Sequence, residues 1–121
     1  MTDAELLRHA DAAAKRAYAP YSNYFVGAAV LARDGTVVEG VNVENAAYPL
    51  GTCAESGALA AAVAAGYRPG DLEAIAITAS PCGGCRQRLH EFRLERVIYR
   101  RGDGSVATAS PSELLPDTFD L

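Results

Sequence analysis

All three cysteines lie in two short stretches, Cys53-Ala54-Glu55 and Pro81-Cys82-Gly83-Gly84-Cys85. Cys82 comes 29 positions after Cys53, so the chain must fold back on itself if all three sulfurs are to meet. Three thiolates can hold a tetrahedral zinc ion and leave its fourth position open. An odd number of cysteines, two of them spaced C-x-x-C, favours metal ligation in a reducing compartment over a disulfide framework. The cysteines therefore predict a fold built to bring these two stretches together.

Composition excludes several classes of protein. At 121 residues the chain is long enough for one core, so we expect a single domain over residues 1–121. The net charge is −4 and no Lys/Arg cluster occurs, which disfavours a nucleic-acid partner. No apolar run approaches the roughly 20 residues of a membrane span, and the N-terminus lacks signal-peptide features. We therefore expect a cytoplasmic protein with no membrane contact.

The hydrophobic pattern and the turn signals predict alternating helices and strands. Asp34-Gly35 indicates a tight hairpin, and Asp3 and Pro20 are candidates to begin and end the first helix. The expected elements together form one mixed sheet of about five strands with helices on both faces. They are a helix at 3–17, strands at 26–32 and 36–43, a helix at 53–65, a strand at 72–79, a helix at 82–92, strands at 96–100 and 105–109, and a short helix opening at 110–113.

Cys53 and Cys82 each fall at the start of a predicted helix. Unpaired N–H groups and the positive end of the helix dipole stabilise anions there, so we expect lowered thiol pKa values at both positions. The residues between them leave room for a helix and a returning strand, so two helix N-termini can converge on one metal ion. Gly57, inside the first of these helices, costs helix propensity, and we expect it to mark a tight contact. Bound zinc would lower the pKa of its water toward about 7 and supply hydroxide at neutral pH.

Glu55 lies two residues after Cys53 and can move protons on a water at the open zinc position. Zinc with three thiolates carries a net charge of −1, and Arg86, beside Cys85, is the expected compensating cation. The C-x-x-C pair alone is also compatible with a redox pair or a structural zinc site. A structural site would need a fourth ligand, but His9 and His90 lie outside both motifs. Three cysteines with a nearby glutamate are typical of zinc-dependent nucleobase deaminases.

Asn42 and Glu44 are two positions apart, so on an extended backbone their side chains point to the same side. An amide next to a carboxylate can bind a pair of hydroxyls, such as those of a ribose. The alternative is a polar strand exit that satisfies loop backbone groups. The position just before the first cysteine motif favours the hydroxyl-binding interpretation.

Several stretches resemble the small, three-cysteine cytidine deaminases, and the resemblance covers nearly the whole chain. It implies a three-layer α/β/α sandwich around a mixed five-stranded sheet. It also implies a homotetramer that converts cytidine and deoxycytidine to uridine and deoxyuridine in pyrimidine salvage. The matching stretches are Ala19-Pro20-Tyr21-Ser22, Val26-Gly27-Ala28-Ala29, Asn42-Val43-Glu44-Asn45-Ala46-Ala47-Tyr48, Cys53-Ala54-Glu55, Pro81-Cys82-Gly83-Gly84-Cys85-Arg86-Gln87 and Glu113-Leu114-Leu115-Pro116.

The resemblance also implies roles for individual residues. One zinc ion per subunit would be held by Cys53, Cys82 and Cys85, with Glu55 transferring protons during attack on C4 of the base. The remaining implied contacts are with the nucleoside: Asn42 and Glu44 on sugar hydroxyls, Tyr24 stacking on the base, the Ala54 backbone and the Ser80-Pro81 segment on the pyrimidine edge, and Phe119 reaching a neighbouring subunit's site.

Three departures from the family pattern bear on the site. Ser56 stands where many members have an arginine that moderates thiolate charge, so Arg86 would carry more of that compensation. Tyr24 replaces a common phenylalanine, which keeps base stacking and adds a hydroxyl. The segment Thr78-Ala79-Ser80 is shorter than in many relatives, and a shorter loop could widen the base pocket.

Three other functions remain open at this stage. A deaminase of a modified cytosine nucleoside, such as a blasticidin-like or N4-substituted cytidine, would use the same metal chemistry. An RNA- or DNA-editing deaminase would need basic and aromatic single-strand contacts, which the acidic composition disfavours. A non-catalytic, zinc-bound oligomerisation module would have no use for Glu55.

Overall fold

Five strands form one mixed sheet in the order β2-β1-β3-β4-β5. The structure is a computed structural model that describes residues 1–121. The β3–β4 pair is parallel and the other neighbours are antiparallel, which confirms the predicted mixed sheet. The strands are β1 (Gly27–Ala32), β2 (Val37–Val41), β3 (Leu72–Ile77), β4 (Arg96–Arg100) and β5 (Val106–Ala109).

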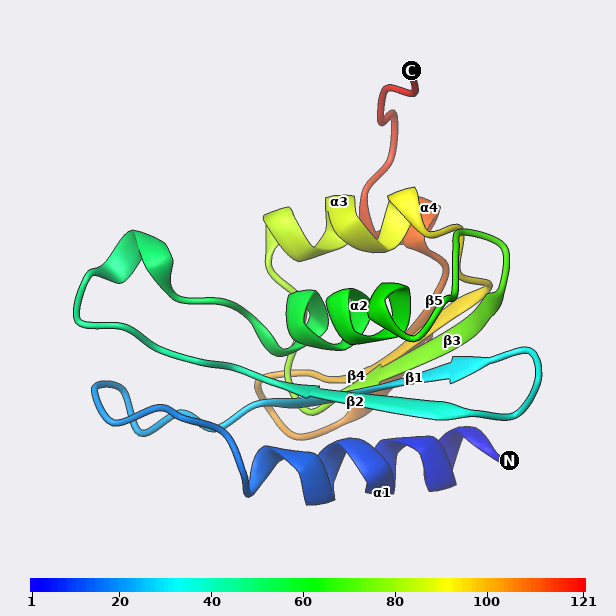
Figure 1. Ribbon diagram of the computed structural model, residues 1–121. Helices are drawn as coiled ribbons and strands as arrows, with labels where there is room; N and C mark the ends of the chain where they lie inside the picture. The colour runs from blue at the N-terminus through cyan, green and yellow to red at the C-terminus, as the bar shows by residue number, and fades with distance from the viewer.

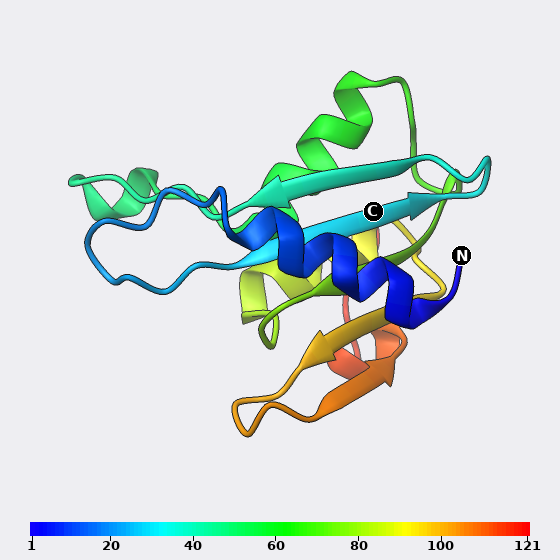
Figure 2. The same ribbon diagram turned by 90° about the horizontal axis from the view of Figure 1, so that it is seen from below.

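Helices cover both faces of the sheet and make three layers, as expected (Figure 1). Helix α1 (Asp3–Ala14) lies under one face, and Figure 2 shows it crossing the strands. Helices α2 (Ala54–Ala64), α3 (Gly83–Glu91) and α4 (Pro111–Leu114) lie on the other. Strand β1 is buried along its whole length, and its side chains alternate between a core of 16 residues on the α2 side and one of 8 on the α1 side. None of the helices is long and apolar enough to cross a membrane.

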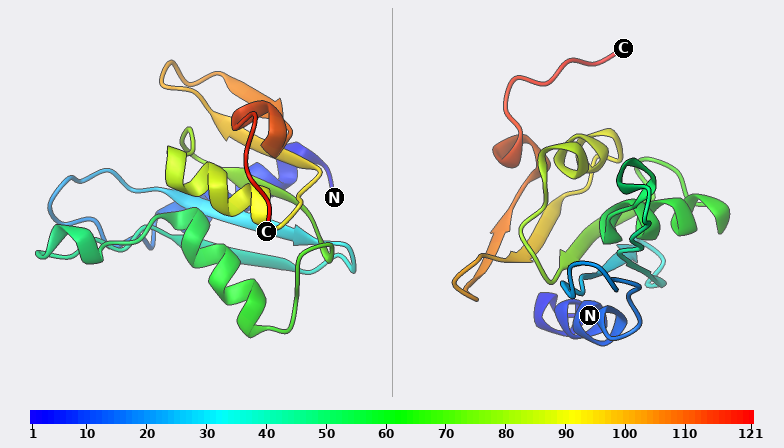
Figure 3. Two further views of the ribbon diagram at one scale, coloured as in Figure 1. Left: turned by 90° about the horizontal axis from the view of Figure 1, so that it is seen from above. Right: turned by 90° about the vertical axis from the view of Figure 1, so that its left-hand side faces the viewer.

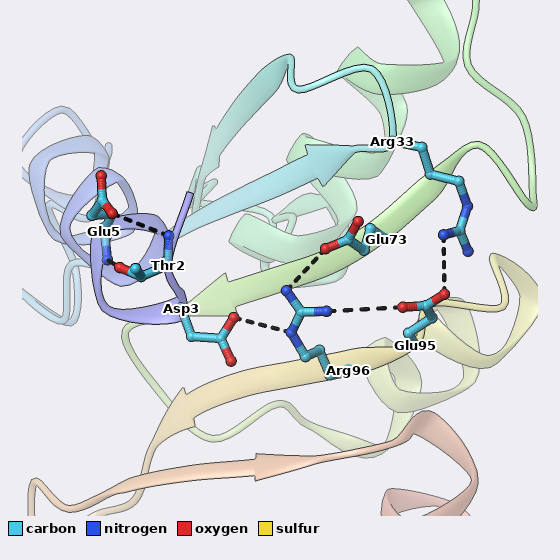
Figure 4. Close-up of polar contacts among 7 residues, drawn as sticks. All are labelled: Thr2, Asp3, Glu5, Arg33, Glu73, Glu95 and Arg96. Atoms are coloured by element: carbon cyan, nitrogen blue, oxygen red, sulfur yellow. Dashed lines mark hydrogen bonds and ion pairs between the residues drawn. The ribbon is translucent and has the colours of Figure 1, made fainter.

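The first helix begins and ends differently from the prediction. Its N-cap is Thr2, whose hydroxyl accepts the Glu5 N–H while the Glu5 carboxylate accepts the Thr2 N–H. Asp3 instead pairs with Arg96 on β4, 3.0 Å away, which ties the start of α1 to the sheet (Figure 4). The helix ends at Ala14, six residues before Pro20, so the proline does not end it.

The hairpin between β1 and β2 turns at Asp34-Gly35, as predicted. Gly35 has φ +92°, a conformation that side chains with a Cβ rarely adopt, and the Asp34 carboxylate accepts the Thr36 N–H at 2.9 Å. Strand β2 ends at Val41 rather than at position 43. The chain beyond it joins the 15–26 segment in a lobe that projects past the sheet, with the short 3-10 helix η1 (Tyr48–Leu50) at its tip (Figure 1).

Gly40 on β2 allows α2 to lie directly against the sheet. A Cβ at this position would lie 2.5 Å from the Ala54 carbonyl oxygen and also against the backbone of Ala58. The prediction of a tight contact at Gly57 was wrong, because a Cβ there would stand 3.4 Å from the Val41 carbonyl oxygen. The close contact at Gly40 fixes the first turn of α2, and with it Cys53 and Glu55.

Candidate metal centre

The three cysteine sulfurs converge where α2 and α3 begin. Cys53 is the N-cap of α2, Cys82 is the N-cap of α3, and Cys85 lies in the first turn of α3. The two helices start side by side next to the projecting lobe (Figure 3, left). The sulfur atoms all lie within 4.8 Å of one another, and no disulfide joins them. Zinc–sulfur bonds of about 2.3 Å place tetrahedral ligands roughly 3.8 Å apart, so this set fits a zinc ion.

The three thiols differ in how readily they ionise. The pKa of Cys82 is lowered, first by the backbone N–H of Cys85, as expected at a helix start. Burial raises the pKa of Cys53, contrary to the prediction, and also raises that of Cys85. Desolvation outweighs the helix dipole at these two positions. A bound divalent cation is therefore what favours all three groups as thiolates.

Glu55 is the one buried charged residue, with 4% of its surface exposed. It lies in the first turn of α2, two positions after Cys53, and lines the same cleft as Cys53 and Cys82. Burial raises the pKa of its carboxyl, while Cys85 and Arg88 act in the opposite direction. A carboxyl that holds its proton more readily than usual, beside three metal-binding sulfurs, suits the transfer of protons to and from a bound substrate.

A cleft of about 320 Å³ opens between these helix starts and the projecting lobe. Tyr48 and Thr52 also line it, and the sequence reasoning did not single them out. Tyr48 carried a usable signal, because it ends the stretch that begins at Asn42. The predicted site residues that line the cleft are Tyr24, Asn42, Glu44, Cys53, Ala54, Glu55, Ser80 and Cys82.

Asn42 and Glu44 hold the loop that carries Tyr24. The Glu44 carboxylate accepts the N–H groups of Tyr21 and Ser22, at 2.9 and 3.1 Å, and the Ser22 hydroxyl. Asn42 accepts the Val26 N–H at 2.9 Å and donates to the Tyr24 carbonyl at 2.8 Å. These hydrogen bonds match the alternative interpretation, in which the pair satisfies loop backbone, although both residues also line the cleft.

The Arg86 guanidinium hydrogen-bonds other groups and no cysteine sulfur, so its expected charge compensation stays a prediction. Its Nε donates to the Pro81 carbonyl at 2.9 Å and its Nη1 to the Leu114 carbonyl at 3.0 Å, which joins α3 to α4. Arg88, which the sequence reasoning missed, has its Nη1 3.9 Å from the Cys85 sulfur. Residues three apart share a helix face whereas adjacent ones do not, and this spacing was the available signal.

Four predicted site residues do not line the cleft: Cys85 and Arg86, described above, and Ser56 and Phe119. Ser56 lines a separate cavity between α2 and α3. Phe119 is 72% exposed in the C-terminal segment, near His90. His90 contacts Asp120 and Thr118, and the other histidine pairs with Glu39. Neither histidine belongs to the metal-binding cluster.

Comparison with known proteins gives consistent matches. Residues 1–101 match the family model described as "Cytidine and deoxycytidylate deaminase zinc-binding region". A cytidine deaminase of Halalkalibacterium halodurans is 42% identical over 122 residues, covering 94% of this chain and 91% of the relative. One from Mycobacterium tuberculosis is 41% identical over 126 residues, covering 98% and 91%.

Solved crystal structures of cytidine deaminases are also similar to this chain. The crystal structure of a cytidine deaminase from Burkholderia pseudomallei superposes with a TM-score of 0.92 at 47% identity, covering 98% of this chain and 100% of that one. The Mycobacterium tuberculosis enzyme gives a TM-score of 0.83 at 39% identity, covering 100% of both chains.

Proposed function

The chain belongs to the cytidine and deoxycytidylate deaminase family, and we propose that it hydrolytically deaminates cytidine and deoxycytidine to uridine and deoxyuridine. One observation carries this proposal: three sulfurs lie within 4.8 Å of one another, and two of the residues that hold them, Cys53 and Cys82, line a cleft together with the one buried carboxylate of the chain. A purely structural zinc site has no use for that carboxylate. The arrangement therefore favours an enzyme over a non-catalytic oligomerisation module.

The chemistry divides between the metal and the side chains. Cys53, Cys82 and Cys85 hold the zinc, which when bound supplies Lewis-acid activation of a water molecule. Glu55 accepts one proton from that water and delivers it to the ring nitrogen as the oxygen bonds to C4; it then accepts the second proton of the same oxygen and delivers it to the amine, which leaves as ammonia when its bond to C4 breaks. The raised pKa of Glu55 helps it to carry each proton. We assign the pyrimidine edge to the Ala54 backbone and the Ser80-Pro81 segment, and base stacking to Tyr24.

Asn42 and Glu44 keep hydrogen-bonding capacity for a sugar while they hold the loop. A carboxylate has about four acceptor positions, and Glu44 uses three of them on the loop. The Asn42 amide has a second N–H and a second lone pair beyond its two loop contacts. Both side chains can therefore bind sugar hydroxyls without releasing the loop.

The charges around the cleft favour a nucleoside over a nucleotide. A second cavity of about 340 Å³ adjoins the cleft and shares Glu44, Tyr48 and Gly51 with it. No lysine or arginine of this chain lines either cavity. A phosphate there would meet the Glu44 carboxylate without a counter-charge, whereas phosphate sites use Arg or Lys. Deoxycytidylate and polynucleotides are therefore disfavoured as substrates.

Exposed aromatic and aliphatic side chains on the projecting lobe support self-association. Contiguous apolar surface of this kind marks interaction sites, and we propose a homotetramer with active sites near subunit interfaces and Phe119 reaching a neighbour. Cysteines held as metal ligands also require a reducing environment, which supports a cytoplasmic location. The exposed residues on the lobe are Tyr18, Tyr21, Tyr24, Phe25, Val43, Tyr48 and Leu50.

The test is an ultraviolet assay of the purified, zinc-loaded protein with four substrates: cytidine, deoxycytidine, deoxycytidylate and N4-methylcytidine. We expect turnover of the first two and at least tenfold lower kcat/KM for deoxycytidylate. Preference for N4-methylcytidine would instead support the modified-cytosine alternative, for which the short Thr78-Ala79-Ser80 segment leaves room. No turnover of any substrate at full zinc occupancy would overturn the proposal.

A further inference from the structure

The proposed metal centre concentrates negative charge in a partly buried place. Zinc with three thiolates has a net charge of −1, and an ionised Glu55 beside it brings the cluster to −2. Cys85 is fully buried and Glu55 is 4% exposed, so water screens this charge poorly. Burying charge without compensation is costly. The N-termini of α2 and α3 supply partial positive charge, but a full cation close to the sulfurs would stabilise the cluster further.

Arg88 is the cation whose side chain reaches the ligands. Its Nη1 lies 3.9 Å from the Cys85 sulfur, within hydrogen-bonding range for sulfur. No other lysine or arginine side chain hydrogen-bonds a cysteine of this chain, and Arg86 is engaged with the Pro81 and Leu114 carbonyls.

Small neighbours make room for the Arg88 side chain. Arg88 reaches back one turn of α3 over Gly84, where a Cβ would stand 3.3 Å from its Nη1. Ser56 on α2 and Arg88 on α3 line opposite walls of one cavity of about 240 Å³. The short Ser56 side chain leaves this cavity open, so the guanidinium can approach Cys85 from the side away from the cleft.

We propose that Arg88 is a positioning residue of the metal centre, hydrogen-bonding the Cys85 sulfur and offsetting the charge of the ligand set. Two consequences follow for the zinc-loaded protein. Cys85 is held in place as a ligand, so the metal is released more slowly, and the three sulfurs donate less electron density to the zinc. Because Arg88 touches neither the cleft nor the base, its loss should lower kcat and leave KM nearly unchanged.

The test compares Arg88→Gln with wild type in three measurements. We expect Arg88→Gln to transfer zinc to a chelator about tenfold faster than wild type. Loss of a residue that contacts a metal ligand typically weakens metal binding by about 10- to 100-fold, and we expect the low end because Arg88 lies at the surface. We expect kcat to fall about tenfold with KM within twofold. In the Co²⁺-loaded protein, sulfur-to-cobalt absorption should move to longer wavelength, since a thiolate without its hydrogen bond is a better electron donor.

Matched variants separate this effect from general charge or folding effects. Arg8→Gln makes the same charge change on α1, across the sheet, and should behave as wild type. Arg88→Lys keeps the charge without the planar guanidinium and should restore most of the zinc retention. Ser56→Arg, added to Arg88→Gln, returns a cation from the opposite wall of the cavity and should do the same.

Equal zinc-release rates and equal absorption spectra for Arg88→Gln and Arg8→Gln would overturn the proposal. Failure of both rescue variants to slow zinc release would also overturn it, because the effect would then not follow the positive charge. Zinc release and the cobalt spectrum are measured without substrate. Failure here can therefore be told apart from a wrong substrate assignment.

Discussion

The Ser22 hydroxyl donates a hydrogen bond to the Glu44 carboxylate and accepts the Tyr24 N–H at 3.0 Å. One small side chain therefore connects the residue proposed to bind the sugar with the residue proposed to stack on the base. The Ser22 backbone N–H also donates to Glu44. The geometry of the nucleoside pocket thus depends on a residue that does not itself line the cleft next to the metal.

We expect Ser22→Ala to raise KM for cytidine about five- to tenfold and to leave zinc content unchanged. The loss of one hydroxyl removes a hydrogen bond to a charged group, worth about 1.5–3 kcal/mol, of which part is expressed in substrate binding, and it frees the Tyr24 N–H. Steady-state kinetics with zinc analysis would check this. A fall in kcat at unchanged KM would show that Ser22 acts on the chemical step instead.

Glu44 should titrate below the ordinary glutamate value of 4.5, because hydrogen bonds from Ser22 and Tyr21 stabilise its carboxylate. Because folding lowers the pKa of Glu44, its ionised carboxylate stabilises the folded state at pH values above the ordinary pKa of 4.5. That contribution is lost as pH falls through the lowered value. Carbon-13 NMR of the carboxyl would measure the shift, and Ser22→Ala should move the pKa back toward 4.5. An unshifted pKa in the wild-type protein would contradict the hydrogen bonding described here.

Gly40→Ala should destabilise the protein by about 2–3 kcal/mol, because the new Cβ would push α2 away from the sheet. It should also weaken zinc binding, since Cys53 and Glu55 move with the helix. Gly57→Ala is the matched control. Its Cβ meets only ordinary contacts and alanine gains helix propensity, so its stability should stay within about 1 kcal/mol of wild type. Similar losses in both variants would contradict the close contact at Gly40.

Arg96 on β4 connects three elements through its contacts with Asp3 on α1 and Glu73 on β3 (Figure 4). Its guanidinium lies 3.0 Å from both the Asp3 and the Glu73 carboxylates, and its side chain is 29% exposed. We expect Arg96→Met to cost about 1–2 kcal/mol of unfolding free energy and to leave zinc content unchanged. Arg16→Met, which removes a single exposed pair with Glu39, should cost about 0.5 kcal/mol or less. Equal costs would show that the Arg96 network adds nothing beyond one surface pair.

Local patterns were enough to predict the sheet and the cysteine cluster. Strand β4 has the predicted limits, Arg96–Arg100, because its apolar run lies between clear polar and glycine boundaries. The metal-binding set follows from residue type and spacing alone, since few side chains bind zinc and Cys53 and Cys82 both start helices.

The errors arise where the direction of a side chain or a contact across the chain decides the outcome. Arg86 is adjacent to Cys85 in the sequence and Arg88 is three positions on, but only the Arg88 side chain hydrogen-bonds the sulfur. The close contact lies at Gly40 rather than at Gly57, and this depends on how α2 packs against β2. The sequence of neither segment alone shows that packing. Thr2 caps the first helix through its reciprocal hydrogen bonds with Glu5, while Asp3 pairs with Arg96, a partner 93 positions away.

The most direct test of the account is deamination of cytidine by zinc-loaded Glu55→Gln, with zinc content measured on the same sample. Glu5→Gln is the matched control. Glu5 lies on α1, on the other face of the sheet, and glutamine can replace glutamate in its capping box with Thr2. We predict one zinc per chain in every variant and a loss of about 10³-fold in kcat for Glu55→Gln alone, the scale of general acid–base catalysis. Turnover within tenfold of wild type, with zinc retained, would contradict the assignment of proton transfer to Glu55.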